Sequence, residues 1–202
     1  MTGAARGIGK AIALRYAADG AVVAVDDIDM DGAEKVAAEI VAAGGQATAF
    51  SANVTKSDEV RAMVDAVLTH FGKVDILVNN AGGGAALLGK TSAFRDMAEE
   101  VWKWVVDLNL YGTMICTQSV LDHMIEHRYG KIINFGSIAG VCGLPDWAAY
   151  SAAKGAIISL TKTLAMEVGE YGINVNCISP GAILSRPGSD WSRGTWLRRG
   201  GE

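Results

Sequence analysis

Tyr150 and Lys154 are the two residues whose types and spacing point most directly to chemistry. They lie four residues apart in a segment with helical composition, so the phenol and the ammonium are expected on one helix face. A nearby ammonium stabilises a phenolate and lowers the pKa of a tyrosine from its usual value near 10. Such a pair could exchange a proton with an alcohol near neutral pH. A surface Tyr–Lys pair is the simpler interpretation of the spacing alone.

A glycine-rich loop near the N-terminus forms a second candidate site. Gly3, Gly7 and Gly9 follow the spacing G-x3-G-x-G and lead into a helix expected over residues 10–18. Glycines there permit a tight turn and let the backbone approach a pyrophosphate at the helix N-terminus. Asp26 and Asp27 end the next expected strand, where a carboxylate can accept hydrogen bonds from an adenosine ribose and repel a 2′-phosphate. Simple turn chemistry is the alternative for the glycines by themselves.

Short β-rich runs alternate along the chain with segments of helical composition, and these elements would position both sites. We expect strands over 21–26, 46–52, 74–79, 131–135 and 173–179, and helices over 10–18, 31–43, 57–71, 97–128 and 148–171. This alternation predicts an α/β fold: a doubly wound, Rossmann-like and mostly parallel sheet with helices on both faces.

The pattern is interrupted at both ends, which predicts a fold truncated at both ends. No strand precedes the glycine loop, although such loops normally leave a strand and enter a helix. Residues 184–202 show neither helical nor strand periodicity. We therefore expect a dinucleotide-binding and catalytic domain over 1–183 that lacks its first strand, followed by an irregular tail over 184–202.

Composition narrows the function classes. The chain has 202 residues, half of them apolar, which fits one domain with a sizeable core. A net charge of −4 disfavours nucleic acid as a partner. No apolar run is long enough for a membrane span, and no signal peptide is apparent. Three widely spaced cysteines without a CxxC motif fit a reduced protein in the cytoplasm.

His123, Glu126 and His127 match H-x-x-E-H, a pattern known from zinc proteases. No acidic third ligand is evident, and histidines at a helix C-terminus also suit the helix dipole. We therefore predict no metal site.

Six motifs in order give the chain a resemblance to a known family. They are the glycine loop at 2–9, Asn79-Asn80-Ala81-Gly82 after a strand, Asn109 in Leu-Asn-Leu-Tyr-Gly, Ser137 in Phe-Gly-Ser-Ile-Ala-Gly, Tyr150-x3-Lys154, and Pro180-Gly181 after a strand. Their order and spacing, over residues 2 to about 185, resemble the short-chain dehydrogenase/reductase family.

The resemblance implies roles for four catalytic residues. Tyr150 would be the general acid/base, and Lys154 would lower its pKa and bind the nicotinamide ribose. Ser137 would hydrogen-bond the substrate oxygen, and Asn109 would hold the main chain and a water that relays protons to Lys154.

It also implies a nicotinamide cofactor. The cofactor-binding positions would be Gly3, Arg6, Gly7, Ile8, Gly9, Asp27, Asn53, Val54, Asn80, Ala81, Gly82, Tyr150, Lys154, Pro180, Gly181, Ile183 and Ser185. Asp27 matches the acidic residue that selects NAD, with Asp26 as the second choice, whereas Arg6 could help a 2′-phosphate. Because the two carboxylates of Asp26 and Asp27 outnumber the one guanidinium of Arg6, we expect NAD rather than NADP. Asn53 stands where the family usually has an aspartate near the adenine.

The implied function is hydride transfer between a nicotinamide and a secondary alcohol or ketone, in the manner of a 3-oxoacyl reductase or a sugar or alcohol dehydrogenase. The resemblance further implies a small-molecule alcohol or carbonyl substrate and a homo-oligomer, dimer or tetramer, built partly from the helices at 97–128 and 148–171. The alternative is a catalytically impaired NAD-binding remnant of the same family.

Overall fold

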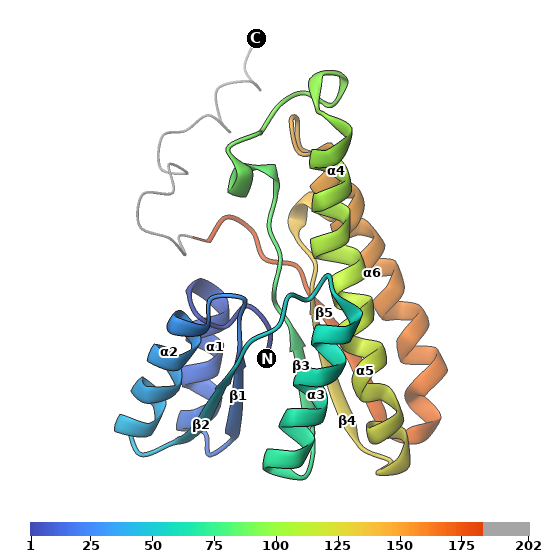
Figure 1. Ribbon diagram of the computed structural model, residues 1–202. Coiled ribbons are helices and arrows are strands. Elements are labelled where there is room, and N and C mark those ends of the chain that lie inside the picture. The colour runs from blue at the N-terminus through green and yellow to red at the C-terminus, as the bar shows by residue number, and fades with distance from the viewer. Residues whose placement is uncertain (184–202) are drawn as a thin grey trace.

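The computed structural model describes residues 1–183 and shows parallel strands flanked by helices (Figure 1). The strands are β1 (Val22–Asp26), β2 (Gln46–Phe50), β3 (Ile76–Asn79), β4 (Gly130–Phe135) and β5 (Ile173–Ile178). The helices are α1 (Gly7–Ala18), α2 (Met30–Ala42), α3 (Ser57–Phe71), α4 (Glu99–Val106), α5 (Gly112–Glu126) and α6 (Ala148–Val168). The α/β prediction is confirmed, with element ends that differ from expectation by a few residues.

The long helix expected over 97–128 is interrupted. A π-helical turn, Asp107–Tyr111, separates α4 from α5. Within it the Asn109 side chain donates to the carbonyl of Val105 at 2.8 Å, one helical turn earlier. π-Turns are rare and often mark functional sites. Apolar periodicity cannot reveal such a turn, because the helix axis continues through it.

The strands form two parallel sheets, β1–β2 and β3–β4–β5. No strand lies between β1 and β3 among the described residues. Met1 and Thr2 occupy the upper end of that position. Thr2 forms a parallel bridge with Asp26, and its N–H donates to the carbonyl of Val78 at 3.0 Å. The N-terminus accordingly lies between β1 and β3 in Figure 1.

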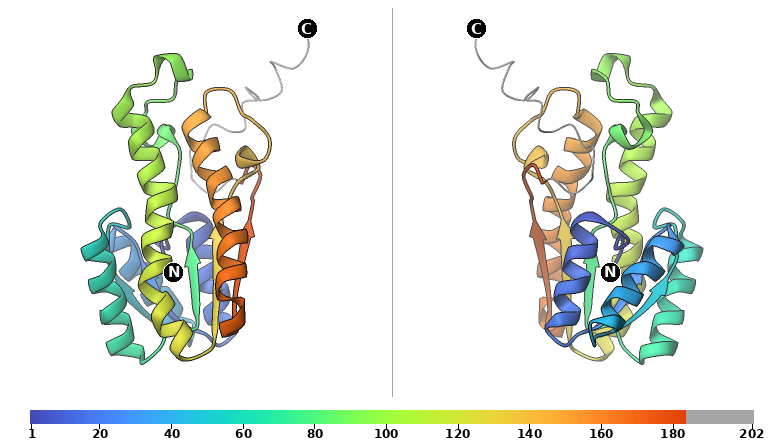
Figure 2. Two further views of the ribbon diagram at one scale, coloured as in Figure 1. Left: turned by 90° about the vertical axis from the view of Figure 1, so that its right-hand side faces the viewer. Right: turned by 90° about the vertical axis from the view of Figure 1, so that its left-hand side faces the viewer.

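Helices cover both faces of the strands. α1 and α2 pack on β1, while α3, α5 and α6 lie on the other face, as the two views of Figure 2 show. The larger apolar core includes Met124, Ile132 and Ile173, all at most 1 % exposed. A second core, with Val25 and Ile40, joins β1 to α1 and α2. Each such side chain contributes about 1.5–3 kcal/mol on burial.

Four buried polar side chains tie the larger sheet to its helices. Asn79 of β3 donates to Asn134 of β4 and to Thr117 of α5, both at 2.9 Å. Asn134 in turn donates to Thr161 of α6 at 3.0 Å. Buried polar groups need such partners, so this network fixes the register of β3, β4, α5 and α6. None of the helices within residues 1–183 combines the length and apolarity that crossing a membrane would need.

Candidate active site

The predicted site residues lie around one edge of the sheets. All paired strands are parallel, so their carboxyl ends point the same way. The segments that follow β1, β3, β4 and β5 contain Asp27, Asn80, Ser137 and Pro180 respectively. In open parallel sheets this edge is where ligands bind.

The glycine loop is a close-packed backbone cradle before α1. A Cβ on Gly9 would lie 2.2 Å from the carbonyl oxygen of Gly3, and one on Gly3 would lie 2.8 Å from the Cα of Ala81. Gly3 and Gly7 also have positive φ angles of 63° and 58°, which favour glycine. Since the N–H of Lys10 donates to the carbonyl of Arg6, the amides of Gly7 to Gly9 precede the first intrahelical bond. The residues present therefore fit a pyrophosphate at this helix end.

Thr2 joins this cradle to the loop after β3. Its hydroxyl oxygen accepts from the N–H groups of Asn80, at 3.2 Å, and of Ala81, at 3.1 Å. The Asn80 side chain donates back to the carbonyls of Thr2 and Gly3. Thr2 belongs to the expected glycine loop, but its own role could not be inferred, because the bonds span nearly 80 residues of sequence.

Asp26 and Asp27 have different environments. Asp27 accepts from the N–H of Ala5 at 3.0 Å and from the N–H of Asp29 at 3.1 Å, which holds its carboxylate beside the glycine loop. Asp26 is 1 % exposed, and neither of its carboxylate oxygens accepts a hydrogen bond from a described side chain. Burial raises the pKa of Asp26 to about 7, partly offset by the nearby Met1 ammonium.

Tyr150 lies on the first turns of α6, half-buried. Burial raises its pKa above the usual value, while the Ser137 hydroxyl, which interacts with the phenol, acts in the opposite direction. The predicted lowering of the Tyr150 pKa by Lys154 is not seen with the protein groups alone. The Lys154 Nζ lies over the phenol ring, 5.6 Å from its centroid.

Lys154 is 4 % exposed and is tied to β4. Its Nζ donates to the carbonyl of Phe135 at 2.6 Å. Burial lowers the Lys154 pKa to about 8. Near neutral pH a larger fraction of Lys154 is therefore unprotonated than of a surface lysine.

Asn109 is fully buried and holds the loop after β3. Its side chain donates to the carbonyl of Gly83 at 2.8 Å and accepts from the Gly83 N–H at 3.0 Å. A Cβ on Gly82 would lie 2.6 Å from Asn109 Oδ1 and 3.3 Å from Lys154 Nζ. The structure therefore brings Asn109, Gly82 and Lys154 together, and it places a main-chain contact of Asn109 at Gly83.

The remaining predicted cofactor-binding residues differ in exposure and in the contacts that they already make. Arg6 is exposed at the N-cap of α1, and Ile8 and Ile183 border one groove. The Asn53 side-chain oxygen already accepts from the N–H and hydroxyl of Thr55, so an adenine amine would compete with both. Val54 is buried against Gly112.

Two further predicted cofactor-binding residues, Pro180 and Gly181, follow β5. The Pro180 carbonyl accepts from the Ile138 N–H at 3.1 Å, which joins this loop to the one containing Ser137. Gly181 is exposed beside Ile138. Ser185 and the tail over 184–202 lie outside the described residues.

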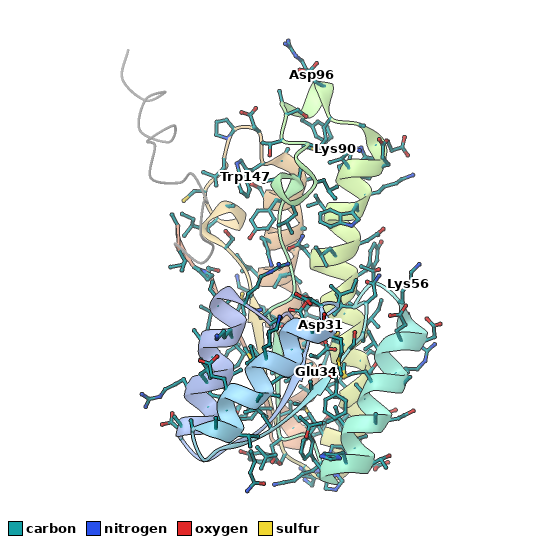
Figure 3. All side chains as sticks on the ribbon, turned by 60° about the vertical axis from the view of Figure 1, so that its left-hand side comes forward. Asp31, Glu34, Lys56, Lys90, Asp96 and Trp147 are labelled. Carbon is teal, nitrogen blue, oxygen red and sulfur yellow. The ribbon has the colours of Figure 1, made fainter. Side chains whose placement is uncertain are left out.

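Trp147, labelled in Figure 3, is a neighbour that the sequence motifs did not indicate. Its ring meets the Tyr150 ring edge-to-face with centroids 5.3 Å apart, and it packs over Gly84. Ala85, Met97 and Ala149 line the same region. One flank of Tyr150 is therefore closed by apolar groups.

The H-x-x-E-H segment forms no evident ligand cluster. His123 Nε2 accepts from the N–H of Val74 at 3.2 Å, and the rings of His123 and His127 stack with centroids 4.1 Å apart. Within residues 1–183, no group of three or more His, Cys, Asp or Glu side chains is placed to hold a metal ion.

A parallel α/β fold with a glycine cradle and a Ser–Tyr–Lys–Asn constellation defines a dinucleotide-dependent oxidoreductase class. The short chain dehydrogenase family model matches residues 1–194, and the chain belongs to that family. It is 44 % identical over 186 residues to a 3-oxoacyl-[acyl-carrier-protein] reductase of Synechocystis, covering 92 % of this chain and 73 % of the relative.

Two solved structures are also similar. An NAD⁺-bound xylitol dehydrogenase superposes with a TM-score of 0.85 at 39 % identity, covering 95 % of this chain and 72 % of that one. A 3-oxoacyl-[acyl-carrier protein] reductase with bound NAD from Brucella melitensis gives a TM-score of 0.86 at 38 % identity, covering 92 % and 71 %.

Proposed function

We propose that this chain is an NAD-dependent oxidoreductase that interconverts a secondary alcohol and a ketone. The observation that carries this function is the convergence of Tyr150, Ser137, Lys154 and Asn109 beside the glycine cradle. When bound, the nicotinamide supplies or accepts the hydride.

Tyr150 is the proposed acid/base. In oxidation its oxygen takes the proton of the alcohol, and in reduction the phenol returns a proton to the carbonyl oxygen. The Ser137 hydroxyl would donate a hydrogen bond to the same substrate oxygen and stabilise charge that develops on it. The Lys154 ammonium, 5.6 Å from the ring centroid, favours the phenolate through a poorly solvated space.

We propose that Asn109 acts together with Lys154 in the site. Asn109 fixes Gly83 through two hydrogen bonds and lies near Lys154 across Gly82. We propose that Asn109 also holds a water that relays protons to Lys154.

Asp27 supports NAD as the preferred cofactor. Two backbone N–H groups hold its carboxylate next to the glycine loop, where it can accept from ribose hydroxyls and repel a 2′-phosphate. Asp26 is withdrawn into the interior and is unsuited to this contact. The two NAD-bound structural neighbours agree with this choice.

The relatives support two substrate classes, 3-oxoacyl thioesters and sugar alcohols. Exposed apolar side chains on the π-helical turn, α5 and α6, namely Tyr111, Met114 and Met166, support a homo-oligomer built through these helices. The cytoplasmic location remains a prediction from the cysteine pattern.

The alternative function is that of a catalytically impaired NAD-binding remnant of the same family. Binding without turnover would be the signature of such a chain.

Absorbance at 340 nm tests the function directly. Purified protein is mixed with NAD and a panel of secondary alcohols, and with NADH and a panel of ketones that includes a 3-oxoacyl thioester. We expect a substrate-dependent change, together with NAD binding by calorimetry. Binding without any change would favour the remnant, and absence of both would contradict the proposed function.

A further inference from the structure

Trp147 stands immediately before α6, and hydrogen bonds fix its backbone on both sides. Its N–H donates to the carbonyl of Leu144 at 3.2 Å, and its carbonyl accepts from the N–H of Ser151 at 2.8 Å. The preceding residue, Asp146, has a φ of 65°, in the left-handed region that residues other than glycine rarely adopt. The turn through Asp146 therefore sets where the Trp147 indole leaves the chain.

The indole lies between the Tyr150 ring and the loop that follows β3; Figure 3 shows Trp147 close to this loop. The two rings meet at an interplanar angle of 74° with centroids 5.3 Å apart. A Cβ on Gly84 would lie 3.0 Å from Cζ3 of the indole, so the ring already occupies the space beside this glycine. The neighbouring Gly83 is held by two hydrogen bonds to Asn109, which leaves the loop little freedom to withdraw from the ring.

The space around the indole on this side of Tyr150 is nearly filled. The cavity that remains has a volume of about 10 Å³, which is room for about one water molecule. Its apolar lining includes Ala85, Met97, Val105 and Ala149. Packed apolar groups of this kind resist the insertion of extra methylene groups. A substituent much larger than a methyl group therefore cannot enter beside Tyr150 while the indole is in place.

We propose that Trp147 is a specificity-determining residue, which admits only a methyl group on its side of Tyr150 and so selects methyl ketones and the matching 2-alkanols. This inference rests on the proposed function, in which Tyr150 and Ser137 bind the substrate oxygen. The two groups on the carbonyl carbon point to different sides, and one of them faces the indole. Any longer group must point away from Trp147. Among 3-oxoacyl thioesters, the 3-oxobutanoyl chain meets this condition because a methyl group adjoins its keto carbon.

The same restriction fixes the stereochemistry of the product. The reaction is the one proposed above, in which the ketone gains a hydride from NADH and a proton from Tyr150. If the methyl group always faces Trp147, the same face of the carbonyl is always presented to the hydride donor. One enantiomer of the alcohol is therefore expected from an unsymmetrical methyl ketone.

Three isomeric ketones test the size limit without a change in overall composition. The smaller group on the carbonyl carbon is methyl in 2-octanone, ethyl in 3-octanone and propyl in 4-octanone. Their kcat/KM values with NADH are measured at 340 nm, and chiral chromatography identifies the 2-octanol that forms. We expect kcat/KM for 2-octanone to exceed that for 4-octanone by at least about a hundredfold, because each methylene that does not fit costs roughly tenfold or more.

Trp147→Ala and Trp147→Phe should relax this selection in proportion to the space they open. We expect the alanine variant to lower the ratio of kcat/KM for 2-octanone to that for 4-octanone by at least about tenfold and to lower the enantiomeric excess of 2-octanol. The phenylalanine variant should lie between it and the parent, and it carries the test if the alanine variant does not fold. Trp102→Ala is the matched control, because Trp102 packs on the apolar cluster of α4 but does not line the space beside Tyr150.

The outcomes separate the role of Trp147 from the proposed function. Equal kcat/KM values for the three isomers in the parent would overturn the role of Trp147, and so would a ratio that neither substitution changes. Reduction of other ketones but of none of the octanones would also overturn it, and in all these cases the proposed function stands. Absence of turnover with every ketone and alcohol would contradict the proposed function, and the inference would fall with it.

Discussion

The two sheets of this protein are held together in different ways. The catalytic half, β3 to β5 with α4 to α6, is joined internally by the Asn79–Thr117–Asn134–Thr161 network and by the bond from Lys154 to Phe135. The nucleotide half, β1 and β2 with α1 and α2, has hydrogen bonds to it that involve Thr2 and Asn80. The catalytic residues thus lie on a frame of buried side-chain hydrogen bonds, while the cofactor cradle is a backbone loop bonded to Asn80. Changes in the first half should affect turnover, and changes in the second should affect binding and stability.

Lys154→Met should have the largest effect and should act on turnover. It removes the ammonium near the Tyr150 phenol, and the unbranched methionine side chain replaces the buried lysine chain that reaches Phe135. We expect turnover to fall by about 10²–10⁴-fold, as for loss of acid/base function. Steady-state assays at 340 nm measure it. Lys162→Met, on the exposed face of α6, is the matched control, and equal losses in both variants would contradict a local role for Lys154.

Asp26→Asn should change how stability of the nucleotide half depends on pH. Burial raises the Asp26 pKa to about 7, well above the usual value of an aspartate, so the protonated carboxyl stabilises the fold fully below pH 4. That contribution is lost as the pH rises through 7, to the extent of roughly 4 kcal/mol. Urea unfolding from pH 4 to 8 should show the variant gaining stability relative to the parent over this range. A constant difference at all pH values would contradict a raised pKa at buried Asp26.

Gly9→Ala should weaken cofactor binding and spare the catalytic half. The added Cβ would lie 2.2 Å from the Gly3 carbonyl and 2.6 Å from Asn80 Nδ2, so the cradle must open. We expect the Kd for NAD to rise by at least about thirtyfold, a loss of roughly 2 kcal/mol. Gly169→Ala is the control, because nothing lies within 4 Å of its Cβ. Calorimetry measures the Kd for NAD in both variants. An equal rise in both would contradict a specific role of Gly9 in the cradle.

Asp27→Ala should have the smallest effect, a change in cofactor choice. Removing the carboxylate next to Ala5 removes repulsion of a 2′-phosphate. We expect the ratio of NADP to NAD affinity to rise about tenfold, or ~1.4 kcal/mol. Asp31→Ala, on the first turn of α2 (Figure 3), tests whether any nearby carboxylate would do. An equal shift in that variant would assign the preference to general charge rather than to Asp27.

The sequence was sufficient for elements and motifs that depend on local pattern. Alternating strands and helices, the glycine loop, and the i, i+4 pair of Tyr150 and Lys154 all follow from spacing. The π-turn at Asn109 did not, because apolar periodicity passes through it unchanged. Contacts at long sequence separation were equally hidden: Thr2 with Asn80, and Lys154 with Phe135. The Tyr150 pKa is raised by burial. The spacing of residues in the sequence does not show how deeply a side chain is buried.

Tyr150→Phe, assayed for both binding and turnover in one preparation, tests the central claim most directly. The phenol hydroxyl belongs to the catalytic half, whereas the cradle at Gly3 and Gly9 lies in the nucleotide half. We predict an NAD Kd within about twofold of the parent and turnover reduced by about 10²–10⁴-fold. Unchanged turnover, or a parallel loss of binding and turnover, would contradict Tyr150 as the acid/base of a short-chain dehydrogenase site.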